Sequence, residues 1–499
     1  MSVRAERIRT NRTHHEPLTT YRDVGDAIRA LRTRIDGEIV LPGDPEWDDT
    51  RQAWNLAVDQ RPFAVGLVDS AEDVLAVVEF ARAQGLRIAP QGTGHGARSL
   101  DALDDTILVK TSRLRGVEID AEARRARVEA GALWADVVEP AAEQGFVVLH
   151  GSSPDVGVVG YTLGGGMGWL ARSRGLSANS VTAVEIVTAD GRLVRADCDK
   201  EPDLFWAVRG GGGSFGIVTA IEITLYEEPE LYAGAMFWPV ERAGEVLQTW
   251  RDWVETVPDA VTSVGRILHF PPIPDIPEAL RGGSFALVEA VYVGPESEGA
   301  ALVAPLRELE PAIDTFAAVT PTALQHLHMD PPKPVPGLGD GMFLDGLPAA
   351  AVDAVVAAGV PPLLSIEIRQ LGGALAERSP QHGAVGSIDA GYVMFAAGLA
   401  MTPEMGAAVD EAVTRSKEAL APWESERAYF NFSERPLDAA RLYPAQTYRR
   451  LRRIKAAYDP GELFVSNHPI PALAPARHAR RVRGMRSADL TTRVAPELG

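Results

Sequence analysis

The chain of 499 residues contains one cysteine, Cys198, and has no long apolar run. A single thiol excludes an internal disulfide framework and any metal site built from several cysteines. We expect Cys198 to be a buried, small apolar residue. No segment approaches the ~20 apolar residues of a membrane span, and residues 1–17 lack the apolar stretch of a signal peptide. These absences favour a soluble, cytoplasmic protein.

Basic residues are also few relative to acidic ones. The chain has 49 Lys and Arg and 68 Asp and Glu, which gives a net charge of −19. This balance argues against nucleic acid or an anionic membrane as the main partner. The exception is the C-terminal end, where arginines occur among few acids, namely Arg477, Arg480, Arg481, Arg483 and Arg486. A flexible, solvated tail is the favoured interpretation, and an electrostatic docking segment is the alternative.

The length predicts at least two domains, and the pattern of apolar residues changes near 227–230. Before that point, strands alternate with helices at 71–84 and 132–144, which predicts an α+β region. The strands expected there are 61–68, 86–90, 106–110, 127–130, 147–149, 181–188 and 216–225.

Beyond residue 230 the pattern predicts an antiparallel sheet backed by helices. The expected elements are strands at 233–238, 285–293, 364–371 and 391–399 and helices at 243–257, 297–306 and 403–421. Two proline-rich stretches, 271–277 and 331–336, predict loops over one face of the sheet. A last helix at 445–458 should stop at Asp459-Pro460-Gly461.

Three glycine-rich loops follow predicted strands or helices of the first region. The first is Gly92-Thr93-Gly94-His95-Gly96-Ala97, and the others lie at 163–168 and 210–216. Bare backbone N–H groups in such loops can close around a diphosphate. A single loop of this kind is often a plain turn or a linker. Three of them in one region favour a large cofactor threaded between backbones.

The first loop also fits the dinucleotide fingerprint, as Gly92-x-Gly94-x-x-Ala97 with Glu118 or Asp120 downstream. A Rossmann loop, however, opens directly into a long helix that holds the pyrophosphate. Here residues 98–105 lack a helical repeat and lead into a strand. We therefore reject a nicotinamide-binding domain.

The order and separation of four motifs resemble the FAD-linked oxidases of the berberine bridge enzyme type, within the vanillyl-alcohol oxidase superfamily. The motifs are 90–96, 151–157 with Gly160 and 163–169 behind it, 210–219 and 463–470. The resemblance implies an α+β, two-domain FAD-binding PCMH-type fold. Its FAD-binding domain would span 20–228, completed by 437–499, and an antiparallel-sheet substrate domain would be inserted at 229–436.

By the same resemblance, His95 is attached covalently to the 8α-methyl carbon of the flavin. Some members carry a second link through a cysteine where this chain has Ser153, so one bond is expected. Val156 stands where members that react with oxygen commonly have valine, which favours an oxidase. The cofactor-binding residues implied besides His95 are Gln91, Gly92, Thr93, Gly94, Gly96, Ala97, Ser153, Val156, Gly157, Gly160, Leu163, Gly164, Gly168, Gly216, Val218 and Asn467.

The catalytic base is where the chain departs from its relatives. Many relatives end a Tyr-x-Asn-Tyr motif with a tyrosine, but the chain reads Tyr429-Phe430-Asn431-Phe432, and Phe432 cannot accept a proton. Others have a glutamate on a strand that aligns near Met394, and none is present there. The replacement candidates are Tyr429, Glu367 and Tyr392, followed by Arg369, His326 and His328.

Alternation places Glu367 and Arg369 on one face of a strand. They are interpreted as a plain ion pair, with a general base as the alternative. His326 and His328 are interpreted as part of a solvated loop, since nothing nearby completes a metal site. The orientation of His150 is left open.

The expected activity is that of an oxidase of secondary metabolism. It would pass a hydride from an alcohol, a phenolic or a glycosylated substrate to the flavin, and dioxygen would reoxidise the flavin with release of peroxide. Trp238, Tyr392 and Phe395 are expected to roof the substrate pocket. Because both usual bases are absent, a flavin-fold protein with a non-redox cyclase or binding role is the alternative.

Overall fold

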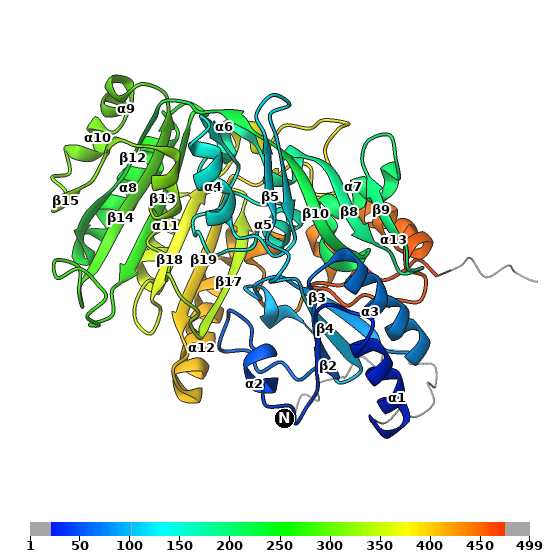
Figure 1. The fold of residues 1–499 in the computed structure, drawn as a ribbon. Helices are drawn as coiled ribbons and strands as arrows, with labels where there is room; N and C mark the ends of the chain where they lie inside the picture. The colour runs from blue at the N-terminus through cyan, green and yellow to red at the C-terminus, as the bar shows by residue number, and fades with distance from the viewer. Residues whose placement is uncertain (1–20, 101, 475–499) are drawn as a thin grey trace, which may run out of the picture.

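The computed structural model of the chain describes residues 21–100 and 102–474, so the predicted basic tail lies outside the described residues. Three sheets of three or more strands organise the described chain (Figure 1). Two smaller sheets belong to the first region, and the largest belongs to the second. No helix of the described part is both long enough and apolar enough to span a membrane.

The first sheet has the order β1-β2-β4-β3. Its strands are β1 (Glu38–Val40), β2 (Ala64–Leu67), β3 (Arg87–Gln91) and β4 (Thr106–Lys110), and β2, β4 and β3 run parallel. The crossover helix α3 (Ala71–Gln84) begins where Ser70 accepts a hydrogen bond from the amide of Asp73, and it ends at Gly85 in the left-handed conformation. Helices α1 (Tyr21–Arg32) and α2 (Trp47–Thr50) precede it.

The second sheet is antiparallel, with the order β5-β6-β10-β8-β9. Its strands are β5 (Val117–Asp120), β6 (Arg125–Glu129), β8 (Val181–Val187), β9 (Leu193–Ala196) and β10 (Ile217–Thr224). A short pair joins β7 (Phe146–Val147) to β11 (Tyr226–Glu227). The helices of this part are α4 (Trp134–Ala142), α5 (Val158–Leu163), α6 (Ala171–Arg174) and α7 (Pro202–Gly211).

The C-terminal segment returns to the first sheet. Helix α13 (Ala445–Tyr458) ends at the predicted Asp459, whose carboxylate accepts from the ammonium of Lys455 and from the amides of Leu463 and Phe464. The chain then runs beside β3, where the amide of Ile88 donates to Leu463 at 2.8 Å and that of Val465 donates to Ile88 at 2.7 Å. The last motif therefore lies against the strand that precedes the His95 loop.

The largest sheet is antiparallel and eight-stranded, in the order β15-β12-β14-β13-β18-β19-β17, with β16 paired to β12. Its strands are β12 (Leu231–Pro239), β13 (Val261–His269), β14 (Ser284–Val293), β15 (Ile313–Asp314), β16 (Ala317–Ala318), β17 (Gly337–Leu344), β18 (Ser365–Gln370) and β19 (Tyr392–Leu399). The accompanying helices are α8 (Ala243–Val254), α9 (Glu296–Leu302), α10 (Ala304–Arg307), α11 (Ala349–Ala358) and α12 (Pro403–Leu420).

The two faces of this sheet differ in what covers them. Along β19, Tyr392, Met394 and Ala396 join an apolar core with residues of α8, α11 and α12. Val393 and Phe395 point to the opposite face, because side chains alternate along a strand. There Val393 packs with Met167 and Leu176 of the first region. The junction between the two regions therefore lies on the face without helices.

The structure corrects several expectations about both regions. The strands β13 and β17 and the helix α11 were not predicted, and the helix predicted at 297–306 is two short helices, α9 and α10. Trp238 is fully buried in the helix-covered core, as is Tyr392, so neither roofs a pocket at the junction. Cys198 is exposed rather than buried, because it lies in the turn after β9.

The helix-covered core generates a stability prediction at Trp250 of α8. Its side chain is buried, and its indole N–H donates to Ser263 Oγ at 3.1 Å. Trp250→Ala should lower the free energy of unfolding by about 3–5 kcal/mol, because it leaves a cavity and removes the hydrogen bond from the indole to Ser263. The midpoint of urea unfolding measures this. Met401→Ala, at an exposed side chain, should leave the midpoint unchanged, and an equal midpoint for both variants would contradict the packing.

Candidate active site

His95 lies in the loop that follows β3. Its ring stacks on Trp54, with centroids 4.0 Å apart and planes at 18°. Nδ1 lies 2.7 Å from Thr93 Oγ1, and Nε2 lies 3.8 Å from Asp155 Oδ1. The side chain keeps 25% of its exposure. The imidazole is thus held in a fixed orientation and remains accessible at the surface of the loop.

Asp155 joins the His95 loop to the second motif. Ser153 Oγ donates to Asp155 Oδ1 at 2.7 Å, and the indole of Trp54 donates to Oδ2 at 2.6 Å. Burial acts to raise the pKa of Asp155, but His95, Ser153 and Trp54 together lower it below its ordinary value. A Cβ at Gly157 would lie 3.4 Å from Thr93. The predicted residues of these two motifs are therefore neighbours.

The last motif reaches the same loop through Asn467. Its Nδ2 donates to the carbonyl of Gly96 at 2.5 Å, and a Cβ at Gly96 would overlap that nitrogen. Gly94 has φ +91°, and a Cβ there would lie 2.9 Å from Ala53. A side chain at Gly94 or at Gly96 would therefore collide with its neighbours, so both positions require glycine. Residues from the two ends of the chain thus converge on His95.

An open space borders this loop. Gly96 and Gly160 are exposed, and Gly92, Thr93, Val156 and Tyr161 are half-buried, although their neighbours Ala97, Val158, Val159 and Thr162 are buried. A Cβ at Gly160 would meet no atom of the described chain within 4 Å. Bare backbone with free space beside it fits a large flat cofactor, as the sequence predicted.

Other predicted cofactor residues have a packing explanation. Gln91 is buried and donates to Gln60 at 3.0 Å, and Ala97, Leu163 and Val218 are buried as well. A Cβ at Gly216 would lie 2.6 Å from the carbonyl of Val187, and at Gly164 and Gly168 it would overlap Asn431 and the carbonyl of His150. These glycines allow close approach of neighbouring chain segments; a role in binding the cofactor remains a prediction for all of them.

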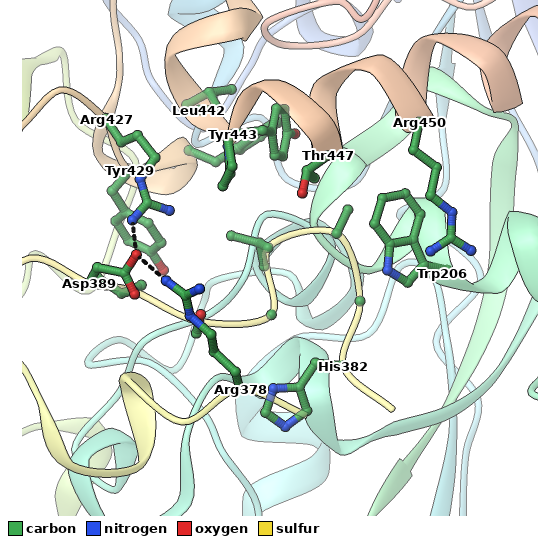
Figure 2. A pocket seen from close by; sticks show the side chains of 18 of the residues that line it. Trp206, Arg378, His382, Asp389, Arg427, Tyr429, Leu442, Tyr443, Thr447 and Arg450 are labelled. Carbon is green, nitrogen blue, oxygen red and sulfur yellow. Dashed lines mark hydrogen bonds and ion pairs between the residues drawn. The ribbon is translucent and has the colours of Figure 1, made fainter. Parts of the chain in front are cut away.

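Tyr429 packs behind the second glycine loop. It is buried, and its hydroxyl interacts with the backbone amides of Gly166 and Met167. Burial raises the pKa of this hydroxyl, although Arg369 and the amides act in the opposite direction. Its ring lines a pocket of about 340 Å³, beside which Arg378 and Arg427 both pair with Asp389 (Figure 2). His95 and Glu367 do not line that pocket, so it is separate from the His95 loop and from Glu367.

A charged cluster occupies the junction face of the large sheet. His328 lies between two carboxylates, with Nδ1 2.7 Å from Glu289 Oε2 and Nε2 2.6 Å from Glu367 Oε2. The other oxygen of Glu367 accepts from Arg369 Nε at 2.7 Å. Arg266 donates from Nη1 to the carbonyl of His328 at 2.7 Å. Burial of charged groups is tolerated here because each one is paired.

The cluster sets the protonation of its members. Burial and Arg266 favour a neutral His328, but Glu289, Glu367 and Asp330 outweigh them and raise the pKa of His328 to about 9. Burial also acts to raise the pKa of Glu367, yet Arg369 and His328 hold it well below its ordinary value. His328 is therefore an imidazolium at neutral pH, and Glu367 is a carboxylate.

The structure thus revises the candidate bases. The predicted Glu367–Arg369 ion pair is confirmed. The solvated loop predicted for His328 is wrong, because its side chain is only 3% exposed. Tyr392 does not meet Glu367 or Tyr429, since it points to the helices and donates to Glu255 at 3.0 Å. Glu289 was missed, although a lone carboxylate within the apolar run of β14 was a signal.

Two contacts connect the cluster to the glycine loops. Ser152 Oγ donates to Asp330 Oδ2 at 2.6 Å, and the ring of Trp169 lies 6.0 Å from that of His328. His150 lies nearby but is turned aside, since Nδ1 is 2.6 Å from the carbonyl of Gly151. Burial lowers the pKa of His150 to about 4, so its ring is neutral. The His95 loop and the cluster therefore border one junction.

The close approach at Gly168 can be tested by one methyl group. Gly168→Ala should lower the melting temperature by several degrees, because the methyl overlaps a backbone carbonyl that cannot rotate away. Calorimetry measures the change. Gly244→Ala, at a helical glycine whose added Cβ meets nothing within 4 Å, is the matched control. A Gly168→Ala variant as stable as this control would refute the packing described.

The buried imidazolium predicts a pH dependence of stability. The pKa of His328 is raised, so its contribution is fully present below the unfolded value of 6.5 and is lost as the pH rises through about 9. The melting temperature of the wild type should fall over this range. His328→Gln should remove this part of the fall, whereas His382→Gln, outside the cluster, should keep it. Parallel curves for the wild type and His328→Gln would show that His328 is not charged.

Comparisons with known proteins agree with this architecture. The FAD binding domain family matches residues 62–197, and the berberine and berberine-like family matches residues 428–471. The uncharacterised FAD-linked oxidoreductase YvdP of Bacillus subtilis is 30% identical over 315 residues, which cover 62% of this chain and 67% of that protein. (R)-6-hydroxynicotine oxidase of Paenarthrobacter nicotinovorans is 35% identical over 205 residues, covering 41% and 45%.

The fold has a solved counterpart. The crystal structure of 6-hydroxy-D-nicotine oxidase from Arthrobacter nicotinovorans superposes with a TM-score of 0.75 at 25% identity, covering 87% of this chain and 98% of that one. The predicted α+β fold of PCMH-type FAD-binding oxidases is thereby confirmed. The chain belongs to the berberine bridge enzyme-like FAD-linked oxidoreductases of the vanillyl-alcohol oxidase superfamily.

Proposed function

We propose that this oxidoreductase is an oxidase whose FAD is attached through His95 alone. The observation that carries the proposal is the placement of His95. Its imidazole is accessible, held by Thr93 and Trp54, and bordered by bare backbone with open space. A neutral imidazole nitrogen is a nucleophile suited to forming such a bond. Ser153 offers no thiolate for a second link, and its hydroxyl is engaged with Asp155.

FAD, when bound, supplies the acceptor for a substrate hydride and returns the electrons to dioxygen as hydrogen peroxide. The protein binds the cofactor and orients it. Gly92, Gly94 and Gly96 offer backbone to the diphosphate, and Asn467 holds their loop from the C-terminal side. Val156, half-buried in the loop of Ser153, supports reaction with oxygen, because oxygen-reactive relatives commonly have valine there.

The substrate class is proposed to be an alcohol, a phenolic or a glycosylated secondary metabolite. Two relatives are named as oxidases of 6-hydroxynicotine, which supports a small organic substrate with a ring. At the junction, Phe395 and Phe432 are both half-buried, with ring centroids 5.0 Å apart. They offer an apolar surface to such a molecule.

Neither remaining base candidate is free to take a proton. Both oxygens of Glu367 are occupied, and the Tyr429 hydroxyl is buried against the glycine loop. This occupancy favours a second candidate function, a flavin-fold protein without redox chemistry. Peroxide formation with a panel of alcohols and phenols separates the two. A flavin that stays oxidised in anaerobic mixtures with the whole panel would favour the non-redox alternative.

Attachment through His95 predicts one FAD of added mass on the denatured wild-type chain. His95→Ala should fold and bind FAD but release it on acid precipitation, because the glycine loop dominates binding of the phosphates. It should also oxidise substrate more slowly, since loss of the link lowers the flavin potential. Intact-mass spectrometry and the colour of the precipitate measure the outcome.

Ser153→Ala is the matched control and should keep its FAD on denaturation. A wild-type flavin that washes off completely would refute the attachment. Flavin retained by His95→Ala would show that another residue forms the bond.

A further inference from the structure

Arg369 of β18 is the cation of the cluster that faces the junction. It shares a strand face with Ser365 and Glu367, opposite the residues that pack on the helices. Its guanidinium carbon lies 5.1 Å from the centroid of Phe432, the position where many relatives have a tyrosine base. Its positive charge also acts to lower the pKa of the Tyr429 hydroxyl, against the larger effect of burial, which raises it. Arg369 therefore lies where the reacting oxygen of a substrate would need a partner side chain.

The guanidinium is held at one edge and open at the other. Nε donates to Glu367, which holds this edge, while Nη2 lies 3.2 Å from His328 Nε2, a nitrogen that accepts no hydrogen bond in the imidazolium form. Nη1 has no partner in the described chain, and the side chain keeps 14% of its exposure. An arginine fixed through one edge presents its remaining N–H groups in a defined direction.

Glu289 and His328 make this arrangement rigid. Glu289 of β14 is fully buried and holds His328 from the side opposite Glu367. Arg266 of β13 lies 3.5 Å from Glu289 Oε1 and fixes the His328 carbonyl. Three sheet strands and one loop thus position a single guanidinium. These residues act through Arg369, so they are positioning residues.

Three cations and three carboxylates make up the cluster. Arg266, His328 and Arg369 face two buried carboxylates, Glu289 and Glu367. Asp330, the third carboxylate, is half-buried and accepts from Ser152. Arg369 Nη1 is a donor of the cluster that remains without a hydrogen bond in the described chain, and an anionic oxygen would accept a charge-assisted hydrogen bond from it.

We infer that Arg369 binds an ionised oxygen of the substrate, so that the substrate is an aromatic anion, either a phenolate or an aryl carboxylate. Phe395 and Phe432 contact its ring. The inference rests on the proposed function for the reaction but concerns binding alone. A phenol bound here would lose its proton to water as it binds, with the oxygen's electron pair retained and stabilised by Arg369. No protein base is then required, which agrees with Phe432 in place of tyrosine.

The test is equilibrium binding to the oxidised holoenzyme without turnover. The probes are 4-nitrophenol, below its solution pKa, and benzoate; the bound phenolate of the first is seen as a difference absorption band. Wild type should bind at least one of them saturably, and 4-nitrophenol, if bound, should be ionised. Arg369→Gln should weaken this binding by about tenfold or more, because a charge-assisted bond is lost. Arg369→Lys should restore part of it.

Controls separate an anchor from a merely structural arginine. Nitrobenzene, which has no ionisable oxygen, should bind the wild type and Arg369→Gln equally. Arg378→Gln, at an arginine 75% exposed and outside the cluster, should leave the binding of every probe unchanged. His328→Gln should weaken anion binding less than Arg369→Gln and should alter its pH profile, because the positioning imidazolium is lost.

Binding of 4-nitrophenol alone assigns the phenolate, binding of benzoate alone assigns the carboxylate, and either result supports Arg369 as the anchor. Equal affinity of the wild type and Arg369→Gln for the anions would overturn the assignment. So would 4-nitrophenol bound as the neutral phenol, or no saturable anion binding to the wild type. These readouts do not require peroxide, so a failure of the oxidase proposal is recorded separately.

Discussion

The site depends on how closely bare backbone can approach its neighbours. A side chain at Gly168 would overlap the carbonyl of His150, and one at Gly96 would overlap the side chain of Asn467. The first contact folds the second motif region onto itself, and the second brings the last motif onto the loop of His95. Gly96 and Asn467 are hundreds of residues apart in the chain, and glycine at position 96 is what lets the two segments meet.

The two faces of the large sheet have different roles, since one contributes to stability and the other carries the side chains of the site. One face is apolar and covered by α8, α11 and α12, where Trp250, Met394 and Val409 pack together. The other face carries Glu289, Glu367 and Arg369 towards the first region. A buried charged cluster adds little net stability, since desolvation offsets its pairing. The role of the charged cluster is instead to orient Arg369 within an otherwise apolar junction.

The sequence predicted the parts of the site that are local. Glycine loops after strands located His95, and alternation along one strand placed Glu367 beside Arg369. The positions of Glu289 and His328 could not be predicted, because Glu289 and Glu367 both reach His328 only after strands far apart in the chain pair in one sheet. The same limit explains why Tyr392 was wrongly expected to roof the substrate pocket. Alternation puts it on the face of Met394, and tertiary packing decides which face the helices cover.

The most direct test is a crystal structure of the protein with FAD bound. We predict continuous electron density between the flavin and His95, with the ring system at the junction between residues 153–157 and the face of β18 that carries Arg369. Density that leaves His95 unattached, or a ring system away from both Arg369 and Phe432, would contradict this prediction.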